Sequence, residues 1–564
     1  MEENNFIYEN GKIFTSDEDN LHADSMIVEN GYIKWIGKKE DRPTCDFPII
    51  DLNNACILPG FVDAHMHPVM LADFSKEISA LPPKVNSIKD LIAEIKTKAQ
   101  QLRKDNKNEW ILGWGYDEGK FAEKRSITRW DLDEGTEDFP VAIIRTCGHI
   151  RCVNSKALAL AGIDKNTKDP EGGQIERDEF GEPTGVLKEN ARNLVLPYIP
   201  ELNEAEKVQN LVDLGDLLIS QGIVAVCDMG NLDKSDNYTY YREAIAKGFK
   251  QEVSMYYMWD FFMHDKDFAI SKEKQNNDNQ VFVAGLKLIG DGSVSGKTAW
   301  MDKPYLNSNS CGISVCSDEQ LETAIDFCKR NKCQLSVHAM GTNAIKRVVD
   351  RVYEEKDWLN QDRPYVRVEH ITLPSQDSIN KAVEKNIGFV TQPIFLYAEI
   401  ESYLQNLGED IMKECYPIKS LLEQKVNLCF STDAPATSWA VPSDPFVCIK
   451  GAVTRKAYDN TDYTSYLGLW DGVVNEGEPE QKLIAELNED GEAGLLRLTE
   501  IWCAMNGVPA IVIFEGGQSE LLANVVAQIY AHLLQHPSRD PVGLAVYVEL
   551  RYMTASLMLG EWFE

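Results

Sequence analysis

Two histidines one residue apart are the clearest candidates for chemistry in the sequence. They are His65 and His67, in the segment ILPGFVDAHMHP. In an extended strand, residues i and i+2 point to the same side, so the two imidazoles can face one metal ion. Imidazole suits zinc and neighbouring divalent metals. Because such pairs are often structural, the rest of the chain must decide the interpretation.

Other polar residues share one kind of position, at or near the ends of apolar segments that are typical of strands. They are Lys287 in AGLKLIGDG, His338 in QLSVHA, His370 in YVRVEH and Asp433 in NLCFSTDAP. The chain has 9 histidines, and four of them occupy such positions. Four unrelated structural histidines would fit this shared placement poorly. The pattern favours a divalent metal site with one or two ions, for which zinc is the expected metal.

The segments that carry these residues alternate with helical segments. Helical periodicity covers residues 91–102, 204–219 and 319–331. Strands alternating with helices predict a parallel sheet. Barrel active sites gather at the carboxyl ends of the strands. We therefore expect an α/β fold with a TIM-type (β/α)8 barrel at residues 58–455.

Residues 1–57 have a different character, with short strand-like runs broken by turn residues. Asn-Gly pairs occur at Asn10–Gly11 and Asn30–Gly31, and such pairs are strong hairpin signals. This region predicts a small antiparallel sheet, equivalent to part of a β-sandwich. Within the barrel region, a Gly-rich insertion covers about residues 140–190 and is typical of a lid over the barrel mouth.

Residues 456–564 form a third region, which is acidic and of unknown role. From Thr461 to Glu564 there are 16 acidic and 4 basic residues. Its periodicity predicts a mostly helical segment, with one strand expected at Val508–Phe514.

The composition limits the partners. The formal net charge is −32, which argues against nucleic acid or an anionic membrane, because both require clustered Lys and Arg. No secretory signal and no apolar run of about 18 residues is visible. The 13 cysteines are scattered, which suggests a reducing compartment and hence the cytoplasm. The expected partner is a small-molecule substrate. The apolar stretches of the C-terminal segment are expected to be buried either against the N-terminal sheet or against a second copy in a homodimer.

The chain resembles the amidohydrolase superfamily, and within it amidohydrolase family 3, which includes N-substituted formamide deformylases and other metal-dependent hydrolases. The matching stretches, in chain order, are ILPGFVDAHMHP, VAIIRTCGHIRCVNSKALALAGI, GGQIERDEFGEPTG, LKLIGDGSVSGKTAWM, SVHAMGTNAI, RVEH, TQP and STDAP followed by DPF. The resemblance extends from Phe6 to Arg455. The segment after residue 458 does not match the family.

The resemblance implies a role for each potential ligand. The pairs are His65 with His67 at the more buried metal and His338 with His370 at the second metal. Lys287, carbamylated on its amine, would bridge the two metals, since an unmodified ammonium would repel them. The alternative for Lys287 is a buried lysine paired with Asp291.

The remaining roles concern the reaction itself. Asp433 would contact the water at the metals, take its proton as general base and return it to the leaving amine. His149, in RTCGH, is a candidate donor to the developing oxyanion, with a structural loop histidine as the alternative. Trp114 and Tyr116 in GWGYD, and Trp439, are candidates for lining the substrate pocket, although aromatic residues are more often part of the core.

Together, the pattern and the resemblance predict a metal-dependent hydrolase that cleaves a C–N bond of an amide or formamide. One alternative is hydrolysis of an ester or cyclic amide on the same scaffold. Another is a non-catalytic regulatory or binding protein that keeps the fold, which the complete set of potential ligands disfavours. Metal analysis separates the non-catalytic protein from both hydrolases, and a panel of acylated amines and esters separates the hydrolases from each other.

Overall fold

The computed structural model describes residues 5–15, 17, 20–146, 150–171, 173–230, 236–259, 268–360, 363–412, 414–454, 457–459 and 511–513. The chain divides into two compact units. The first comprises Met1–His67, Gly215–Ala434 and Ser443–Glu564, and the second comprises Pro68–Leu214 and Pro435–Pro442.

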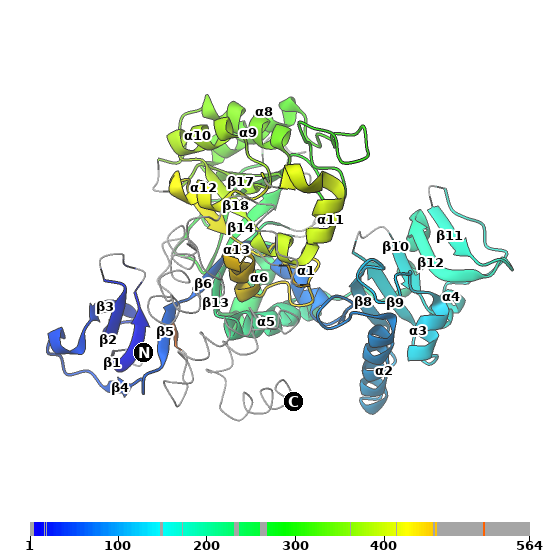
Figure 1. Ribbon diagram of the computed structural model, residues 1–564. Helices are drawn as coiled ribbons and strands as arrows, with labels where there is room; N and C mark the ends of the chain where they lie inside the picture. The colour runs from blue at the N-terminus through cyan, green and yellow to red at the C-terminus, as the bar shows by residue number, and fades with distance from the viewer. Residues whose placement is uncertain are drawn as a thin grey trace, which may run out of the picture. The chain divides into compact units, whose positions relative to one another are not determined.

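The first unit contains an eight-stranded parallel barrel, which confirms the predicted fold class (Figure 1). Its strands, in hydrogen-bonded order, are β6 (Phe61–Met66), β13 (Ile223–Asp228), β14 (Glu252–Met258), β15 (Val281–Ile289), β16 (Gln334–Ala339), β17 (Val366–His370), β18 (Gly388–Thr391) and β19 (Leu428–Phe430). The first and last strands, β6 and β19, are neighbours. Just beyond β19, the amide of Asp433 donates to the carbonyl of His65 at 2.8 Å. These contacts close the barrel.

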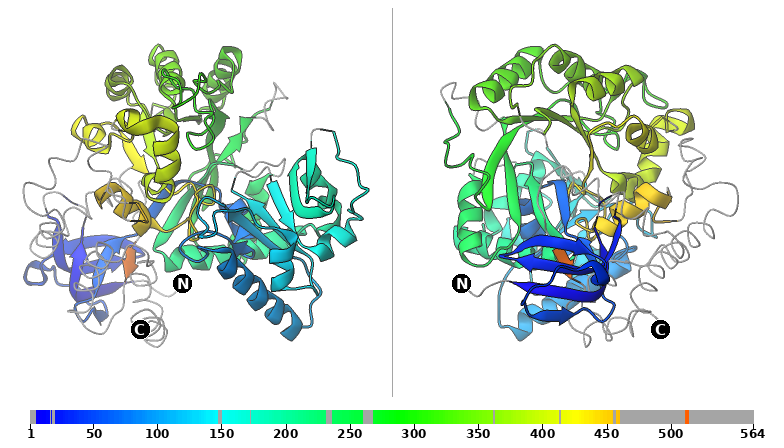
Figure 2. Two further views of the ribbon diagram at one scale, coloured as in Figure 1. Left: turned by 45° about the vertical axis from the view of Figure 1, so that its right-hand side comes forward. Right: turned by 90° about the vertical axis from the view of Figure 1, so that its left-hand side faces the viewer.

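Helices lie on the outside of these strands. Those described are α5 (Glu204–Ser220), α6 (Asn237–Ala246), α8 (Asp318–Asn331), α9 (Thr342–Tyr353), α10 (Gln376–Lys385), α11 (Pro393–Met412), α12 (Ile418–Glu423) and α13 (Pro445–Thr454). Figure 2 shows α8–α12, in green to yellow, outside the strands. Helix α5 includes the predicted helical segment at 204–219, and α8 includes the segment at 319–331.

Helix α8 illustrates how local sequence sets these elements. Ser317 and Gln320 form a capping box at its start, so two orphan amides are satisfied. At its end, Lys332 adopts φ 50°, a left-handed conformation typical of helix termini. The helix buries Leu321, Ile325 and other apolar side chains on one face. That amphipathic face holds the helix against the barrel.

The barrel strands are buried on both sides, because helices cover the outside and side chains fill the interior. Every residue of β6 and β17 is buried, including the polar residues Asp63, His65, Arg367, Glu369 and His370. The interior is therefore strongly polar at the carboxyl ends of these two strands.

A six-stranded sheet, part of the first unit, contains the N-terminal strands. Its strands are β1 (Phe6–Phe14), β2 (His22–Glu29), β3 (Tyr32–Gly37), β4 (Ile49–Asp51), β5 (Cys56–Pro59) and β20 (Ile511–Ile513). Strands β2 and β3 form the hairpin predicted at Asn30–Gly31, where both residues have positive φ, as this turn requires. A short 3₁₀ helix, Lys39–Asp41, follows β3.

The hairpin predicted at Asn10–Gly11 is wrong. Strand β1 continues through these residues, with an irregularity in its pairing with β2 between Glu9 and Ile13. Asn10 adopts φ 58°, so the left-handed residue produces a bulge rather than a turn. A Cβ on Gly11 would lie 2.4 Å from the side chain of Leu52. The glycine is thus required by close packing.

The C-terminal segment contributes one described strand. Strand β20 lies within the predicted strand Val508–Phe514 and pairs antiparallel with β5. The mostly helical character predicted for the rest of residues 456–564 falls almost entirely outside the described residues.

The second unit has a mixed sheet of its own. Its strand order is β11 (Gly173–Arg177), β12 (Pro183–Glu189), β10 (Ile150–Val153), β9 (Val141–Arg145), β8 (Ile111–Tyr116) and β7 (Ile78–Ser79). The unit also contains the helices α1 (Pro68–Phe74), α2 (Ile88–Lys104), α3 (Arg129–Gly135) and α4 (Ser155–Leu160), and the 3₁₀ helices Asn190–Leu194 and Leu196–Tyr198. Two apolar cores pack against this sheet. One includes Leu91, Ile95 and Leu132, and the other includes Leu158 and Leu187.

The predicted insertion at about residues 140–190 corresponds to β9–β12 and α4 of this second unit, which also includes residues 68–139. The predicted three-part division and the lid over the barrel mouth stay predictions. No helix among the described residues is long and apolar enough to cross a membrane.

Candidate metal centre

All six potential ligands lie in the first unit, at the carboxyl ends of barrel strands. His65 is near the end of β6 and His67 follows it. Lys287, His338 and His370 lie on β15, β16 and β17, and Asp433 follows β19. Because parallel strands present their carboxyl ends at one face of a barrel, residues distant in sequence converge there.

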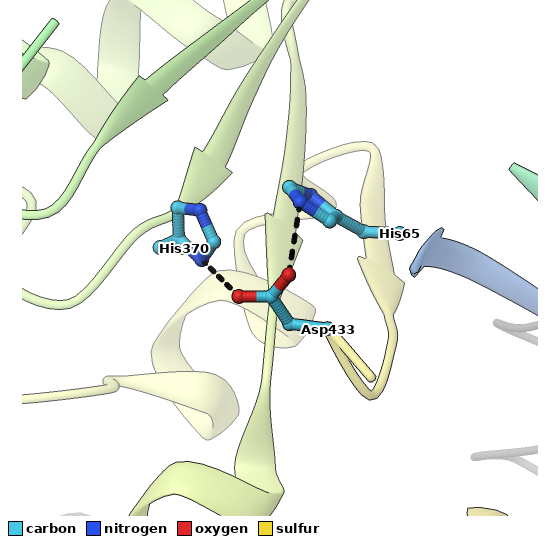
Figure 3. A group of neighbouring side chains, drawn as sticks. All are labelled: His65, His370 and Asp433. Carbon is cyan, nitrogen blue, oxygen red and sulfur yellow. Dashed lines mark ion pairs between the residues drawn. The ribbon is translucent and has the colours of Figure 1, made fainter. Parts of the chain in front are cut away.

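The carboxylate of Asp433 lies close to three of the four histidines. Its Oδ1 lies 3.3 Å from Nε2 of His65 and 3.3 Å from Nε2 of His67, and its Oδ2 lies 3.9 Å from Nδ1 of His370. Figure 3 shows the carboxylate between the rings of His65 and His370. Ligand atoms of His65, His370 and Asp433 all lie within 4.8 Å of one another, a grouping that can hold a metal ion.

Each of the four imidazoles has one ring nitrogen occupied by an oxygen acceptor. These contacts are His65 Nδ1 to Glu369 Oε2 at 2.6 Å, His67 Nδ1 to Gly230 O at 2.7 Å, His370 Nδ1 to Gln392 Oε1 at 2.8 Å and His338 Nε2 to Gly292 O at 3.0 Å. A neutral imidazole that donates from one nitrogen presents a lone pair on the other. This arrangement is typical of metal-ligating histidines.

The residues fit a divalent cation. With Nδ1 of His65 and His67 donating, their Nε2 lone pairs face a carboxylate oxygen at 3.3 Å, which is unfavourable unless a cation lies between them. Asp433 Oδ1 is buried and has no hydrogen-bond partner among the described residues. Imidazole nitrogens together with a carboxylate form a donor set that suits zinc.

The electrostatics favour the metal-binding forms of three candidate ligands, His338, His370 and Asp433. Burial, followed by the charge of Lys287, lowers the pKa of His338 to about 4. Burial also holds the pKa of His370 well below its usual value. Burial alone would raise the pKa of Asp433, but the nearby His65 holds it well below its usual range. Neutral imidazoles beside an ionised carboxylate are the forms that bind a metal.

Lys287 is buried beside the other candidate ligands. Its Nζ lies 3.5 Å from Nε2 of His65, and burial lowers its pKa to about 8. Asp291 instead accepts the backbone amides of Trp300, Met340 and Gly341 at 2.8 to 3.0 Å. Among the described residues, Lys287 forms no ion pair with Asp291. The structure therefore places the amine of Lys287 beside His65 rather than in an ion pair with Asp291.

Several polar residues around the ligands were not singled out by the sequence. Besides Glu369 and Gln392, these include Asp63, which accepts the amide of His65 at 3.1 Å, and Asp228, which accepts the amide of Gly230 at 2.8 Å. Burial raises the pKa of Asp63 to about 7. Glu369 precedes His370 in the RVEH motif and Gln392 belongs to the TQP motif, so these two motifs were the available signal.

The structure describes three of the four other predicted site residues. His149 is outside the described residues. Trp114, Tyr116 and Trp439 belong to the second unit. Trp114 stacks on Phe74 with 5.2 Å between ring centroids, and Tyr116 belongs to one of the apolar cores. The structure therefore places the six potential ligands in the first unit and these three aromatic residues in the second.

The sequence matches the amidohydrolase family over residues 48–478. The chain belongs to the amidohydrolase family. Membership makes it a hydrolase, and the grouping of His65, His370 and Asp433 supports a divalent metal in the barrel. A second family, described as a protein of unknown function (DUF3851), matches residues 455–564, a segment that contains none of the six potential ligands.

Individual proteins are similar to this chain over most of its length. Protein YtcJ of Bacillus subtilis (strain 168) is 28% identical to this chain over 506 residues. The match covers 87% of this chain and 90% of YtcJ. N-substituted formamide deformylase of Arthrobacter pascens is 24% identical to this chain over 454 residues. The match covers 76% of this chain and 81% of the deformylase. The crystal structure of a metal-dependent hydrolase from Pyrococcus horikoshii OT3 superposes with a TM-score of 0.63 at 21% identity, covering 96% of this chain and 99% of that chain. This structural match establishes the fold.

Proposed function

We propose that the protein hydrolyses a C–N bond of a small amide or formamide at a zinc centre held by His65, His67, Lys287, His338, His370 and Asp433. The observation that carries this proposal is the buried Asp433 oxygen, which faces two imidazole nitrogens at 3.3 Å. A further support is the 24% identity to a formamide deformylase over most of both chains.

Each residue has a defined task in this proposal. The four imidazoles would hold a divalent metal through the nitrogen that is not held by an oxygen acceptor. Lys287, whose lowered pKa makes its neutral amine more accessible, would add carbon dioxide and lose a proton, and the resulting carbamate would supply a carboxylate to the same site. When bound, the divalent metal lowers the pKa of water from about 15.7 to near 7 and polarises a carbonyl.

Asp433 handles the proton. It accepts the proton of the attacking water and donates it to the leaving nitrogen, so that the carboxylate is restored at the end of the cycle. Its low pKa keeps it ionised before the reaction. His149 is proposed to donate a hydrogen bond to the developing oxyanion. The described cysteines are all free, which favours a reducing setting such as the cytoplasm.

The test combines metal analysis with a hydrolysis screen. Purified protein should hold one to two equivalents of divalent metal and release amine from N-formyl or N-acyl amines. Turnover of esters or cyclic amides alone would support the alternative substrate on the same scaffold. Protein that binds metal and turns over none of these compounds would contradict the C–N assignment, and protein without bound metal would contradict the metal centre.

A further inference from the structure

We infer that Glu369 is a positioning residue that fixes the ring of His65, so that His65 Nε2 faces the metal position. The inference rests on the proposed metal centre. It adds a residue on β17 that does not bind the metal itself and that acts on a ligand from β6. Strands β17 and β6 are not neighbours in the sheet, so this contact crosses the barrel interior.

The contacts of Glu369 carry the inference. Its side chain is fully buried, and its Oε2 lies 2.6 Å from Nδ1 of His65. Its Oε1 accepts the hydroxyl of Ser336 at 2.7 Å and Nε of Arg367 at 2.5 Å. Nη2 of Arg367 donates to Oε2 at 3.2 Å and also to the carbonyl of Ala64. Both carboxylate oxygens are therefore saturated with donors, which leaves the group little freedom to rotate.

The chemistry of the carboxylate decides the orientation of His65. An ionised carboxylate only accepts hydrogen bonds, so His65 must donate from Nδ1 and keep its lone pair on Nε2. Arg367, at hydrogen-bond distance, balances the buried charge of Glu369. The nearest acceptors of the other three imidazoles are neutral oxygens at 2.7 to 3.0 Å. A charge-assisted hydrogen bond is about twice as strong as a neutral one, so His65 is the most firmly fixed of the four.

The backbone explains how Glu369 and His370, which are consecutive, can both serve one site. Alternation along β17 places Arg367 and Glu369 on one side and His370 on the other. His370 adopts φ 76°, a left-handed conformation, and its ring lies 4.8 Å from that of His65. The last residue of the strand is thus turned back toward the interior, while Glu369 keeps the ordinary inward direction.

The decisive variant is Glu369→Gln in the full-length protein. A carboxamide has similar shape but only one acceptor oxygen, and its amino group would face donors of His65 or Arg367. Zinc affinity, measured by competition with a chelator, should weaken about 10- to 100-fold. Tyr403→Phe is the matched control, because it removes a buried hydrogen bond of the same unit, 2.8 Å to Tyr416, and should leave zinc affinity unchanged.

Two further measurements separate positioning from general destabilisation. Histidine 15N shifts of the metal-free protein should show the Nδ1–H tautomer of His65 in the wild type and a loss of that preference in Glu369→Gln. Glu369→Asp keeps the charge beside Arg367 but shortens the reach to His65, so it should fold and still bind zinc more weakly. Wild-type zinc affinity in both variants, or an unchanged His65 tautomer, would overturn the inference. If the wild type binds no zinc, the metal centre fails, and the tautomer still tests Glu369.

Discussion

The barrel sheet and the mixed sheet of the second unit surround themselves with different side chains. In the barrel, the interior at the carboxyl ends of the strands gathers four imidazoles, a lysine, an arginine and several carboxylates. In the second unit, both faces of the mixed sheet pack against apolar cores, and the aromatic residue Tyr116 at a strand end is part of such a core. Closing a sheet creates a shared interior in which distant residues meet, whereas an open sheet with two covered faces mainly provides apolar burial.

The largest effect is expected when two imidazoles are removed from the barrel. The double variant His65→Ala and His67→Ala should lose most of its bound metal and all measurable turnover, because two donors to the buried position disappear. Elemental analysis by mass spectrometry, together with turnover, measures this. Full metal retention would mean that the polar interior of the barrel is not a metal centre.

Asp433→Asn tests the chemistry of the same interior at constant shape. The amide can still occupy the space but cannot accept a proton, so turnover should fall about 10²- to 10⁴-fold while metal remains bound. The measurement is turnover at matched metal content. A variant with nearly normal turnover would remove Asp433 from the role of general base.

Leu91→Ala addresses the second unit, where the comparison predicts a change in stability alone. Leu91 is fully buried in the core beside Ile95 and Leu132. Large-to-small substitutions at such sites cost about 2 to 5 kcal/mol. Urea unfolding should report this loss, with metal content per folded protein unchanged. Selective loss of metal without destabilisation would contradict the proposed division of roles.

Lys287 allows a finer test through pH. Its pKa is lowered from 10.5 to about 8, so between these values the unfolded chain binds more protons than the folded one. Stability of the metal-free protein should therefore rise with pH across this window. At pH 7 the buried ammonium costs about 3 kcal/mol, so metal-free Lys287→Met should be more stable there, and its advantage should shrink by pH 10. An equal difference in the free energy of unfolding between the two proteins at both pH values would contradict this.

The sequence predicts the barrel and the position of the six candidate residues at its strand ends, for a physical reason. Apolar runs that end in His, Lys or Asp identify parallel strands, and the carboxyl ends of such strands meet at one face. The hydrophobic periodicity and the polarity of a segment are local properties of the sequence. His338 on β16 and His370 on β17 can therefore be placed at strand ends without knowing the fold. The strand at Val508–Phe514 follows from the same reasoning, and the structure has β20 within it.

What the sequence does not predict depends on contacts between distant segments. Alternation would turn His370 away from Glu369, and only its positive φ brings both to the site. The bulge at Asn10 looks like a hairpin turn because the same residue pair serves both conformations. The assignment of Trp114 and Tyr116 as pocket residues stays a prediction, since the side chains of a strand end can face either a core or a ligand.

The closure of the barrel has a consequence for the order of events during folding. Strands β6 and β19 are the first and last of the barrel, with most of the second unit between β6 and β13. Contacts between such distant segments form slowly, because the intervening chain must first lose its freedom. Asp433 reaches the histidines of β6 only when this final seam forms. During synthesis, a chain in which residue 433 has not yet been added would therefore lack the carboxylate of the proposed metal centre, and complete metal loading would be a late event in the maturation of the protein.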